Sequence, residues 1–255
     1  MNPLVRLVYR NLRANLDKAS LFFELIFPLF FIFVQGQGLN GIVKPIQLGN
    51  GVYVSYALFI AAGAVTLTVI NGGTNAGTQL WYDRKNGMFE QILMGPFNRA
   101  QYILSIILAT LIIGIAGSLL VFAIALPVLG ANLNVTLYGA FEVAAALFLG
   151  TIFFGGFAIA LSVVLKSSES FQIISTFIFF VFLFTSTVFY PTGENIPQAI
   201  QTVSLANPLT YCTDAFRAGL FNASTPLVGV ELLVLGIEAS AIFVVAVMAF
   251  RRIRV

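Results

Sequence analysis

Residues Asp83–Arg99, DRKNGMFEQILMGPFNR, form a charged segment between two long apolar stretches of a chain in which only 9% of the residues are charged. A charged segment of this length cannot lie in hydrocarbon, where each unpaired charge is costly, so it must protrude from a membrane. Within the run from Gly87 to Pro96, apolar side chains recur at spacings of three and four and share one helical face: Phe89, Ile92 and Leu93. We expect a short helix that presents this apolar knob, ringed by charge, to a soluble partner.

The composition of the whole chain indicates an integral membrane protein. Hydrophobic residues make up 59% of the 255 residues, and the mean hydropathy is +0.96, far outside the range of soluble domains. The chain contains no histidine, which excludes a Ser-His pair and a histidine metal site. No lysine follows a glycine, so there is no Walker A loop. We expect no catalytic residue, no metal, no cofactor bound by this chain, and no nucleic-acid partner.

Six apolar runs reach the length of about 20 residues that is needed to cross about 30 Å of hydrocarbon. Two further apolar stretches, Ile196–Ala206 and Leu209–Phe221, are too short to span and are punctuated by proline, which indicates re-entrant or interfacial helices. The prediction is a single all-α membrane domain over residues 1–255, with six transmembrane helices and an external re-entrant segment at 190–226. The expected spans are 20–37, 54–79, 101–129, 138–165, 171–189 and 227–250.

The distribution of lysine and arginine predicts the orientation. With these six spans, 11 of the 13 basic residues lie on one side of the membrane, and only Lys44 and Arg217 lie on the other. Because positively charged loops remain in the cytoplasm, both termini and the segment 81–99 are expected there. The protein would be a multi-pass protein of the cell membrane.

The first residues, 1–19, are expected to form an amphipathic helix on the inner leaflet of the bilayer, with its arginines near anionic head groups. This helix could be a topology anchor only, or it could also touch a cytoplasmic partner. Its polar face would hold Arg6, Arg10, Arg13 and Asp17, and its apolar face Val5, Val8, Leu12 and Leu16.

Polar residues inside the expected spans are the candidates for a pathway through the membrane. A stripe of them follows one face of the second span: Thr68, Asn71, Asn75 and Thr78. Hydrogen bonds between helices explain such a stripe as well as a cavity wall that meets a substrate does.

Intramembrane acids are costly and usually face the interior of a bundle, so Glu24 and Glu238 are either structural or part of a pathway or gate. In the fifth span, the ordinary explanation for Phe182, Thr185 and Thr187 is contact with lipid or with neighbouring helices.

The charged segment resembles the cytoplasmic segment of ABC-2 type permeases, in which a pattern close to Arg-x-x-Gly-Thr-x-Glu-x-Leu-x-x-x-Pro is common. Met88 replaces the usual threonine. The later stretch FYPTGENIPQAIQTVSLANPLTYCTDAFRAGLF resembles the region before the last helix of the same family. Its matching external re-entrant residues are Asn207, Pro208, Asp214 and Arg217. The resemblance is closest to the daunorubicin-resistance-like drug-export branch.

The resemblance implies the membrane permease subunit of an ATP-driven exporter for hydrophobic or amphipathic substrates, such as drug-like molecules, lipids or glycolipids. Two six-helix permeases, expected here as a homodimer, would pair above a separate ATPase dimer that binds ATP and Mg. Residues 1–19 would form a connecting helix, and 81–99 would contain the coupling helix, which sits in a groove of the ATPase. Closure of the ATPase dimer would switch the cavity from inward to outward access.

The resemblance also implies roles for individual residues. Glu90 would be a polar anchor to the ATPase, with an intrachain bond to Arg84 or Lys85 as the alternative. The residues expected to contact the ATPase are Arg10, Arg13, Arg84, Gly87, Phe89, Glu90, Ile92 and Leu93. Those expected along the translocation pathway are Glu24, Thr68, Asn71, Asn75, Thr78, Phe182, Thr185, Thr187 and Glu238.

Two other classes of protein stay open at this stage. An ATP-independent six-span channel of aquaporin type also has both termini inside, but it requires two Asn-Pro-Ala motifs, and here Asn207-Pro208 is followed by leucine. The other alternative is a scaffold or sensor subunit that transports nothing.

Overall fold

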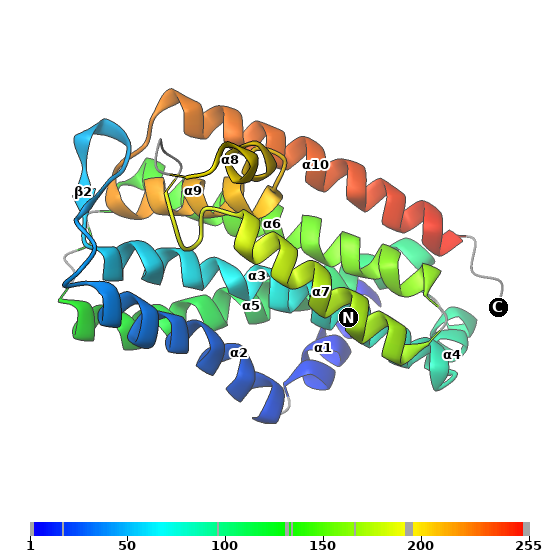
Figure 1. The fold of residues 1–255 in the computed structure, drawn as a ribbon. Helices are drawn as coiled ribbons and strands as arrows, with labels where there is room; N and C mark the ends of the chain where they lie inside the picture. Colours follow the sequence, from blue (N-terminus) through cyan, green and yellow to red (C-terminus); the bar gives the residue numbers. More distant parts are fainter. Residues whose placement is uncertain are drawn as a thin grey trace.

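The long apolar runs fold into long helices that lie side by side along one axis (Figure 1). The computed structural model describes residues 3–16, 18–95, 97–130, 133, 135–165, 167–191 and 196–251. Within this part of the chain, five helices are long and apolar enough to cross a membrane. They are α3 (Tyr56–Lys85), α5 (Arg99–Leu129), α6 (Leu137–Val164), α7 (Ser168–Thr185) and α10 (Pro226–Arg251). The prediction of an all-α integral membrane protein is confirmed.

The first expected span, 20–37, is a helix in two parts. Helix α2 (Lys18–Phe30) contains Pro28 and continues directly into a π-helical stretch, Phe31–Gln37. Its apolar portion, Glu24–Gln37, is shorter than the five long helices. Because this portion falls short of the length that spanning requires by itself, the count of six spans stays a prediction. Before it lies α1 (Pro3–Asn15), the expected amphipathic helix.

Short elements connect the long helices. A hairpin of β1 (Ile46–Gln47) and β2 (Tyr53–Val54) with a 3-10 turn at Gly49–Gly51 precedes α3. Helix α4 (Met88–Met94) follows α3 directly, at the end of the bundle opposite the hairpin (Figure 1). Between α7 and α10 lie α8 (Gln198–Ser204) and α9 (Pro208–Phe221), in the half of the bundle away from α4 (Figure 1).

Polar side chains begin several helices, which explains why the apolar runs break where they do. Each of these side chains accepts a hydrogen bond from a backbone N–H of the first turn, which would otherwise have no partner. Asn98 does so as part of a capping box with Gln101. The other residues in this role are Ser55, Thr136, Ser167 and Asn207.

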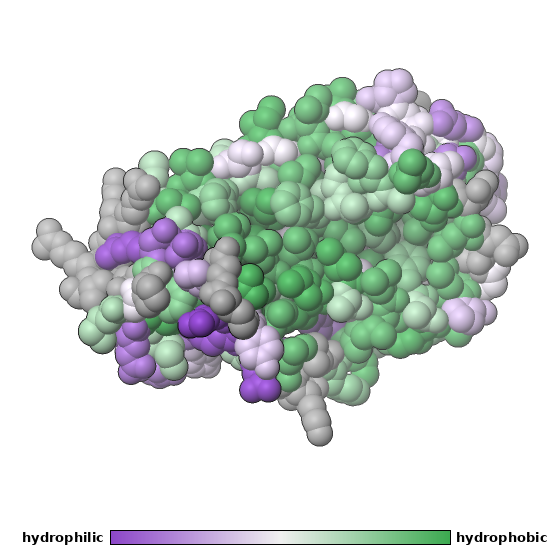
Figure 2. All heavy atoms as spheres, turned by 180° about the vertical axis from the view of Figure 1, so that it is seen from behind, coloured by the Kyte–Doolittle hydropathy of each residue, from purple (hydrophilic) through white to green (hydrophobic). Residues whose placement is uncertain are grey.

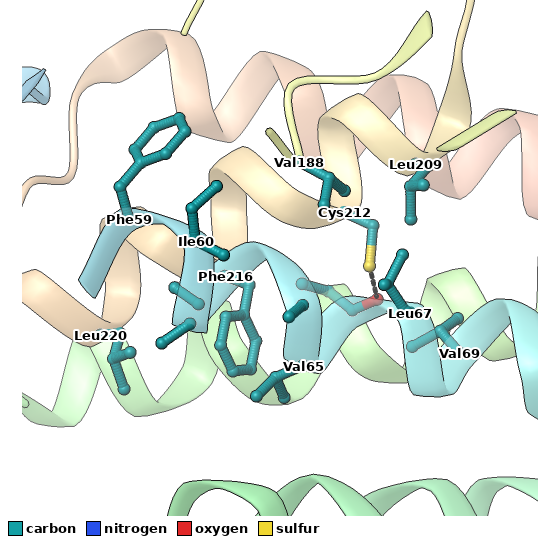
Figure 3. Close-up of a cluster of buried hydrophobic side chains, with 14 of the residues drawn as sticks. Phe59, Ile60, Val65, Leu67, Val69, Val188, Leu209, Cys212, Phe216 and Leu220 are labelled. Carbon is teal, nitrogen blue, oxygen red and sulfur yellow. Dashed lines mark hydrogen bonds between the residues drawn. The ribbon is translucent and has the colours of Figure 1, made fainter. Parts of the chain in front are cut away.

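Helix α3 is the centre of the bundle, and most of its length is buried. It packs against α5, α6 and α9, and Figure 3 shows the apolar side chains that α3 and α9 interleave, among them Phe59, Phe216 and Leu220. Helices α7 and α10 are mostly uncovered. Figure 2 shows the result as a belt of apolar side chains between two ends that carry the hydrophilic ones.

Candidate functional site

Helix α4 packs its apolar face against its own chain. Phe89 is 1% exposed, and its ring lies 5.1 Å from that of Phe250 on α10 and 5.7 Å from that of Tyr102 on α5. Ile92 is also buried in this cluster. The prediction that Phe89 and Ile92 form an exposed knob is therefore wrong, because a short amphipathic helix buries its apolar face on the nearest apolar surface. The side chain of Leu93 lies outside the described part of the structure.

The outer face of α4 carries different residues. Met88 and Met94 are exposed, Met94 by 80%, and the exposed Gln91 lies between them. We call these three residues the outer face of α4. Gly87 starts the helix with a left-handed backbone (φ +68°), a conformation that favours glycine and turns the chain sharply out of α3.

The two charged residues assigned to the coupling segment differ in their surroundings. Glu90 is half-buried and forms no hydrogen bond or ion pair with any described residue, so the alternative of a bond to Arg84 or Lys85 is not observed. The guanidinium of Arg84 donates to the carbonyl of Ser162 at 2.9 Å. Arg84 thus ties the end of α3 to the end of α6, a contact within the chain rather than with a partner.

Helix α1 is anchored to α3 and α5 by polar side chains. Asn11 is fully buried, donates to Ser105 Oγ at 2.8 Å, and accepts from Gln79 Nε2 at 2.7 Å. Asn15 extends this chain by donating to Gln79 Oε1 at 2.7 Å. The sequence prediction missed Asn11, although its spacing of four from Asn15 and from the buried Leu7 marked one face of the helix.

Arg10 also belongs to this anchor. It forms an ion pair with Asp83, which in turn accepts a hydrogen bond from the Tyr102 hydroxyl at 2.6 Å. Arg10 is thus paired within the chain, and its contact with a cytoplasmic partner stays a prediction. Arg13 is exposed and lies over the ring of Tyr9, 5.1 Å from its centroid.

The polar stripe on α3 divides into two kinds of residue. Thr68 is buried and hydrogen-bonds Ser118 Oγ of α5 at 2.9 Å, as the interhelical explanation expects, and its assignment to the pathway stays a prediction. Thr78 donates to the carbonyl of Thr74 in its own helix at 2.9 Å. Asn71 and Asn75 are half-buried, and neither side chain forms a hydrogen bond with the described residues.

Asn75 lines a small polar pocket where four helices meet. Glu24 of α2 also lines it and is 6% exposed, and its Oε1 atom is buried with no hydrogen-bond partner among the described residues. The polar pocket is lined by Asn15, Glu24, Gly72, Asn75, Thr110 and Ile113.

An aromatic pocket lies on the other side of α3, against α6 and α7. Phe182, which was expected along the pathway, lines it and packs edge to face on Phe154 at 5.3 Å between ring centroids. Two polar residues that the sequence prediction missed also line it: Thr74, and Ser175, whose hydroxyl has no partner among the described residues. The remaining residues of the aromatic pocket are Ile70, Phe157, Ala158, Leu161, Ile178 and Phe179.

Arg217 of α9 is the most extensively bonded side chain in the half away from α4. It is 2% exposed, lies 3.5 Å above the ring of Phe59, and donates to the carbonyls of Phe59 (3.1 Å), Thr187 (2.8 Å) and Val188 (2.8 Å). It also pairs with Asp214 at 3.3 Å. Burial lowers the pKa of Arg217 to about 10, so the guanidinium stays charged at neutral pH.

The backbone of α3 leaves room for this guanidinium at Gly63. A Cβ atom at that position would lie 2.6 Å from Arg217 Nη2 and 2.6 Å from the carbonyl oxygen of Val188, which is too close for real contacts. Gly63 is therefore part of the site, and the sequence prediction missed it.

The other residues that were assigned to the external segment hold the end of α7 on α9. Thr187 donates to Asp214 Oδ1 at 2.7 Å, and Asn207 donates to Thr185 Oγ1 at 2.9 Å and to the carbonyl of Phe182 at 2.8 Å. Pro208 follows Asn207 as the first residue of α9. The Thr187 hydroxyl is thus bonded within the chain, and its assignment to the pathway stays a prediction.

Glu238 lies elsewhere, on α10. It is half-buried, its Oε2 atom has no partner among the described residues, and it lines neither of the two pockets.

The comparisons with known proteins agree with this architecture. A family model described as ABC-2 type transporter matches residues 4–221. Two proteins named as transport permease ycf38 are similar to this chain over 200 residues, which is 78% of this chain and 67% of each relative. The identity is 26% for the protein of Pyropia yezoensis and 25% for that of Porphyra purpurea.

Proposed function

Because the chain belongs to the ABC-2 type transporter family, we propose that it is the membrane subunit of an ATP-driven exporter. The chain forms the translocation pathway for a hydrophobic or amphipathic substrate, and a separate ATPase dimer binds ATP and Mg and hydrolyses the nucleotide. Its family distinguishes it from aquaporin-type channels, so that alternative is set aside.

The observation that carries this proposal is the two-sided packing of α4. Its inner face, centred on Phe89, is in ring contact with α5 and α10, whereas its outer face of Met88, Gln91 and Met94 is uncovered. A force applied to the outer face would therefore reach two long helices at once. Such an arrangement is what a coupling helix between an ATPase and a membrane domain requires.

Charge supports the orientation in which α4 lies in the cytoplasm. Lys85 at the end of α3, Arg99 at the start of α5 and Arg251 at the end of α10 gather at the α4 end, and Lys44 lies near the hairpin. Basic residues mark the cytoplasmic side. Both termini would then be cytoplasmic, in the cell membrane.

A second copy of the chain would complete the pathway. The aromatic pocket is formed by α3, α6 and α7, and α7 leaves large apolar side chains such as Phe177 and Phe184 exposed. In a homodimer the two copies of α7 could enclose a central cavity between them.

The test removes the outer face of α4. In a variant carrying Met88→Ala and Met94→Ala, we expect the affinity for the partner ATPase to fall about thirtyfold, because truncating anchors at the centre of an interface commonly costs about 2 kcal/mol or more. Affinity is measured by titrating the ATPase onto permease in lipid nanodiscs, and ATP hydrolysis and transport are measured in reconstituted vesicles.

The matched control is Met248→Ala, the same truncation at an exposed methionine of α10. It should leave ATPase binding unchanged. If the α4 variant binds the ATPase and transports as well as the unmodified protein, the outer face of α4 does not contact the ATPase and the coupling proposal fails. A permease that binds no ATPase at all would instead be the scaffold or sensor subunit.

A further inference from the structure

The polar pocket holds a buried carboxylate with no counter-ion among the described residues. Neither of the ion pairs among the described residues involves Glu24, and its Oε1 atom has no hydrogen-bond partner there. A Cβ atom added at Gly117 of α5 would lie 3.9 Å from this oxygen. A carboxylate in such surroundings is costly unless a cation or several donors reach it.

The other polar groups of the pocket are also free to receive a ligand. The Asn75 side chain and the Thr110 hydroxyl form no hydrogen bonds with described residues, and Asn15 uses its amide nitrogen, leaving its carbonyl oxygen as an acceptor. These groups come from α1, α3 and α5, and Glu24 comes from α2. Four elements therefore aim unsatisfied oxygen acceptors and one negative charge at the same small space.

This set of groups matches the chemistry of an ammonium group. A primary ammonium carries one positive charge and three N–H donors, which suits one carboxylate and two or three neutral oxygens. An anion would be repelled by Glu24, and an alkyl group would leave the carboxylate unpaired. A divalent metal ion fits less well, because the pocket offers a single carboxylate and Ca²⁺ takes about six to eight oxygen ligands.

The walls of the pocket indicate that the rest of the ligand is apolar. Ile113 lines the pocket beside Thr110, and α2 exposes Ile26 two residues beyond Glu24. A molecule with its ammonium in the pocket could lie with its apolar portion against such side chains and the surrounding lipid.

We propose that the polar pocket binds the primary ammonium group of an amphipathic organic cation, with Glu24 as the counter-ion and Asn75 and Thr110 as hydrogen-bond acceptors. The proposal rests on the proposed transport function and specifies its substrate class. In an exporter, this pocket lies in the half of the membrane domain nearest α4, where a substrate from the cytoplasm or the inner leaflet would enter.

The experiment measures binding without the ATPase, so that it does not depend on transport. The probe is dansylcadaverine, a fluorescent amphipathic primary amine, added to purified permease in lipid nanodiscs, with empty nanodiscs subtracted. We expect saturable binding that weakens at least about tenfold in Glu24→Gln. The N-acetylated probe, which lacks the charge, should bind weakly and equally to both proteins.

The matched control is Glu169→Gln, which removes an equal charge from an exposed position at the start of α7. It should bind the amine as the unmodified protein does. Thr110→Val is a second variant and should weaken binding severalfold, so the proposal remains testable if Glu24→Gln does not fold.

Two outcomes overturn the proposal. One is the absence of saturable amine binding to the unmodified protein. The other is amine binding by Glu24→Gln and by Thr110→Val that is as tight as that of the unmodified protein. The proposed function fails separately. If Glu24-dependent binding is observed but vesicles with the ATPase show no ATP-driven transport, the pocket stands and the exporter does not. If vesicles with the ATPase transport a neutral lipid probe but the permease binds no amine, the exporter stands and the ammonium pocket does not.

Discussion

Replacing Arg217 by methionine tests whether this residue fastens α9 into the bundle. Methionine keeps much of the length of the side chain and its apolar stem, but it removes the guanidinium. The carbonyls of Phe59, Thr187 and Val188 then lose their donor, and Asp214 loses its ion-pair partner.

The magnitude follows from these losses. A buried polar group left without a partner costs about 1–3 kcal/mol, and breaking a buried ion pair by removing one member costs about 3–5 kcal/mol in all. We expect Arg217→Met to lower the free energy of unfolding by about 3–5 kcal/mol, since local relaxation will recover part of the sum. For a chain of this size, about 2–4 °C per kcal/mol gives a fall of at least about 6 °C in the unfolding temperature.

The single cysteine supplies the assay. Cys212 is fully buried on α9, with its thiol donating to the carbonyl of Ala146 on α6 (Figure 3). A thiol-reactive fluorophore will therefore report directly on the separation of α9 from the bundle when the protein is heated in detergent. Arg13→Met is the control, because Arg13 is exposed, and it should shift the transition by less than about 2 °C.

A double variant separates the charge effect from the packing effect. Adding Asp214→Asn to Arg217→Met removes the unpaired carboxylate, so part of the lost stability should return. An Arg217→Met protein that unfolds within 2 °C or so of the unmodified one would refute the reasoning, because four interactions would then contribute nothing measurable.

Two further predictions concern the α4 end and the orientation. Phe89→Ala should lower the free energy of unfolding by about 3–5 kcal/mol, because it empties a buried site between Tyr102 and Phe250. The same thiol assay should show a lower unfolding temperature for Phe89→Ala and an unchanged one for Met94→Ala. Equal unfolding temperatures for the two variants would contradict the packing of Phe89. With Cys212 replaced by serine, single cysteines at positions 85 and 168 should react only from the cytoplasmic side and one at position 48 only from outside, and reaction of position 85 from outside would reverse the orientation.

Much of the fold was predictable because helix length in a membrane depends on local composition. The run expected at 138–165 is observed as Leu137–Val164, and that expected at 227–250 as Pro226–Arg251. The two short helices between α7 and α10 were also expected, because the stretches that form them are too short to span and carry prolines. The first run was harder, since Glu24 and Pro28 interrupt it, and it folds as an α-helix joined to a π-helix.

The candidate site was predictable only as a set of residues. Thr68 and Asn75 lie on the same stripe of α3, yet Thr68 bonds to Ser118 and Asn75 faces a pocket. Their spacing assigned both to one face of α3. Whether each side chain finds a hydrogen-bond partner depends on residues of α5 and α2, which are distant in the chain. For the same reason no local pattern around Gly63 indicated that Arg217 would need its space.

Composition and periodicity thus established that this is a helical membrane protein, where its helices run, and which faces of them are apolar or polar. They did not establish what covers each face. Phe89 was recognised correctly as part of an apolar helical face, but its burial depends on Tyr102 and Phe250, which belong to two other helices. Helix formation depends on neighbours in the chain, whereas burial, ion pairs and pockets depend on contacts between distant segments, and only the packed bundle brings those segments together.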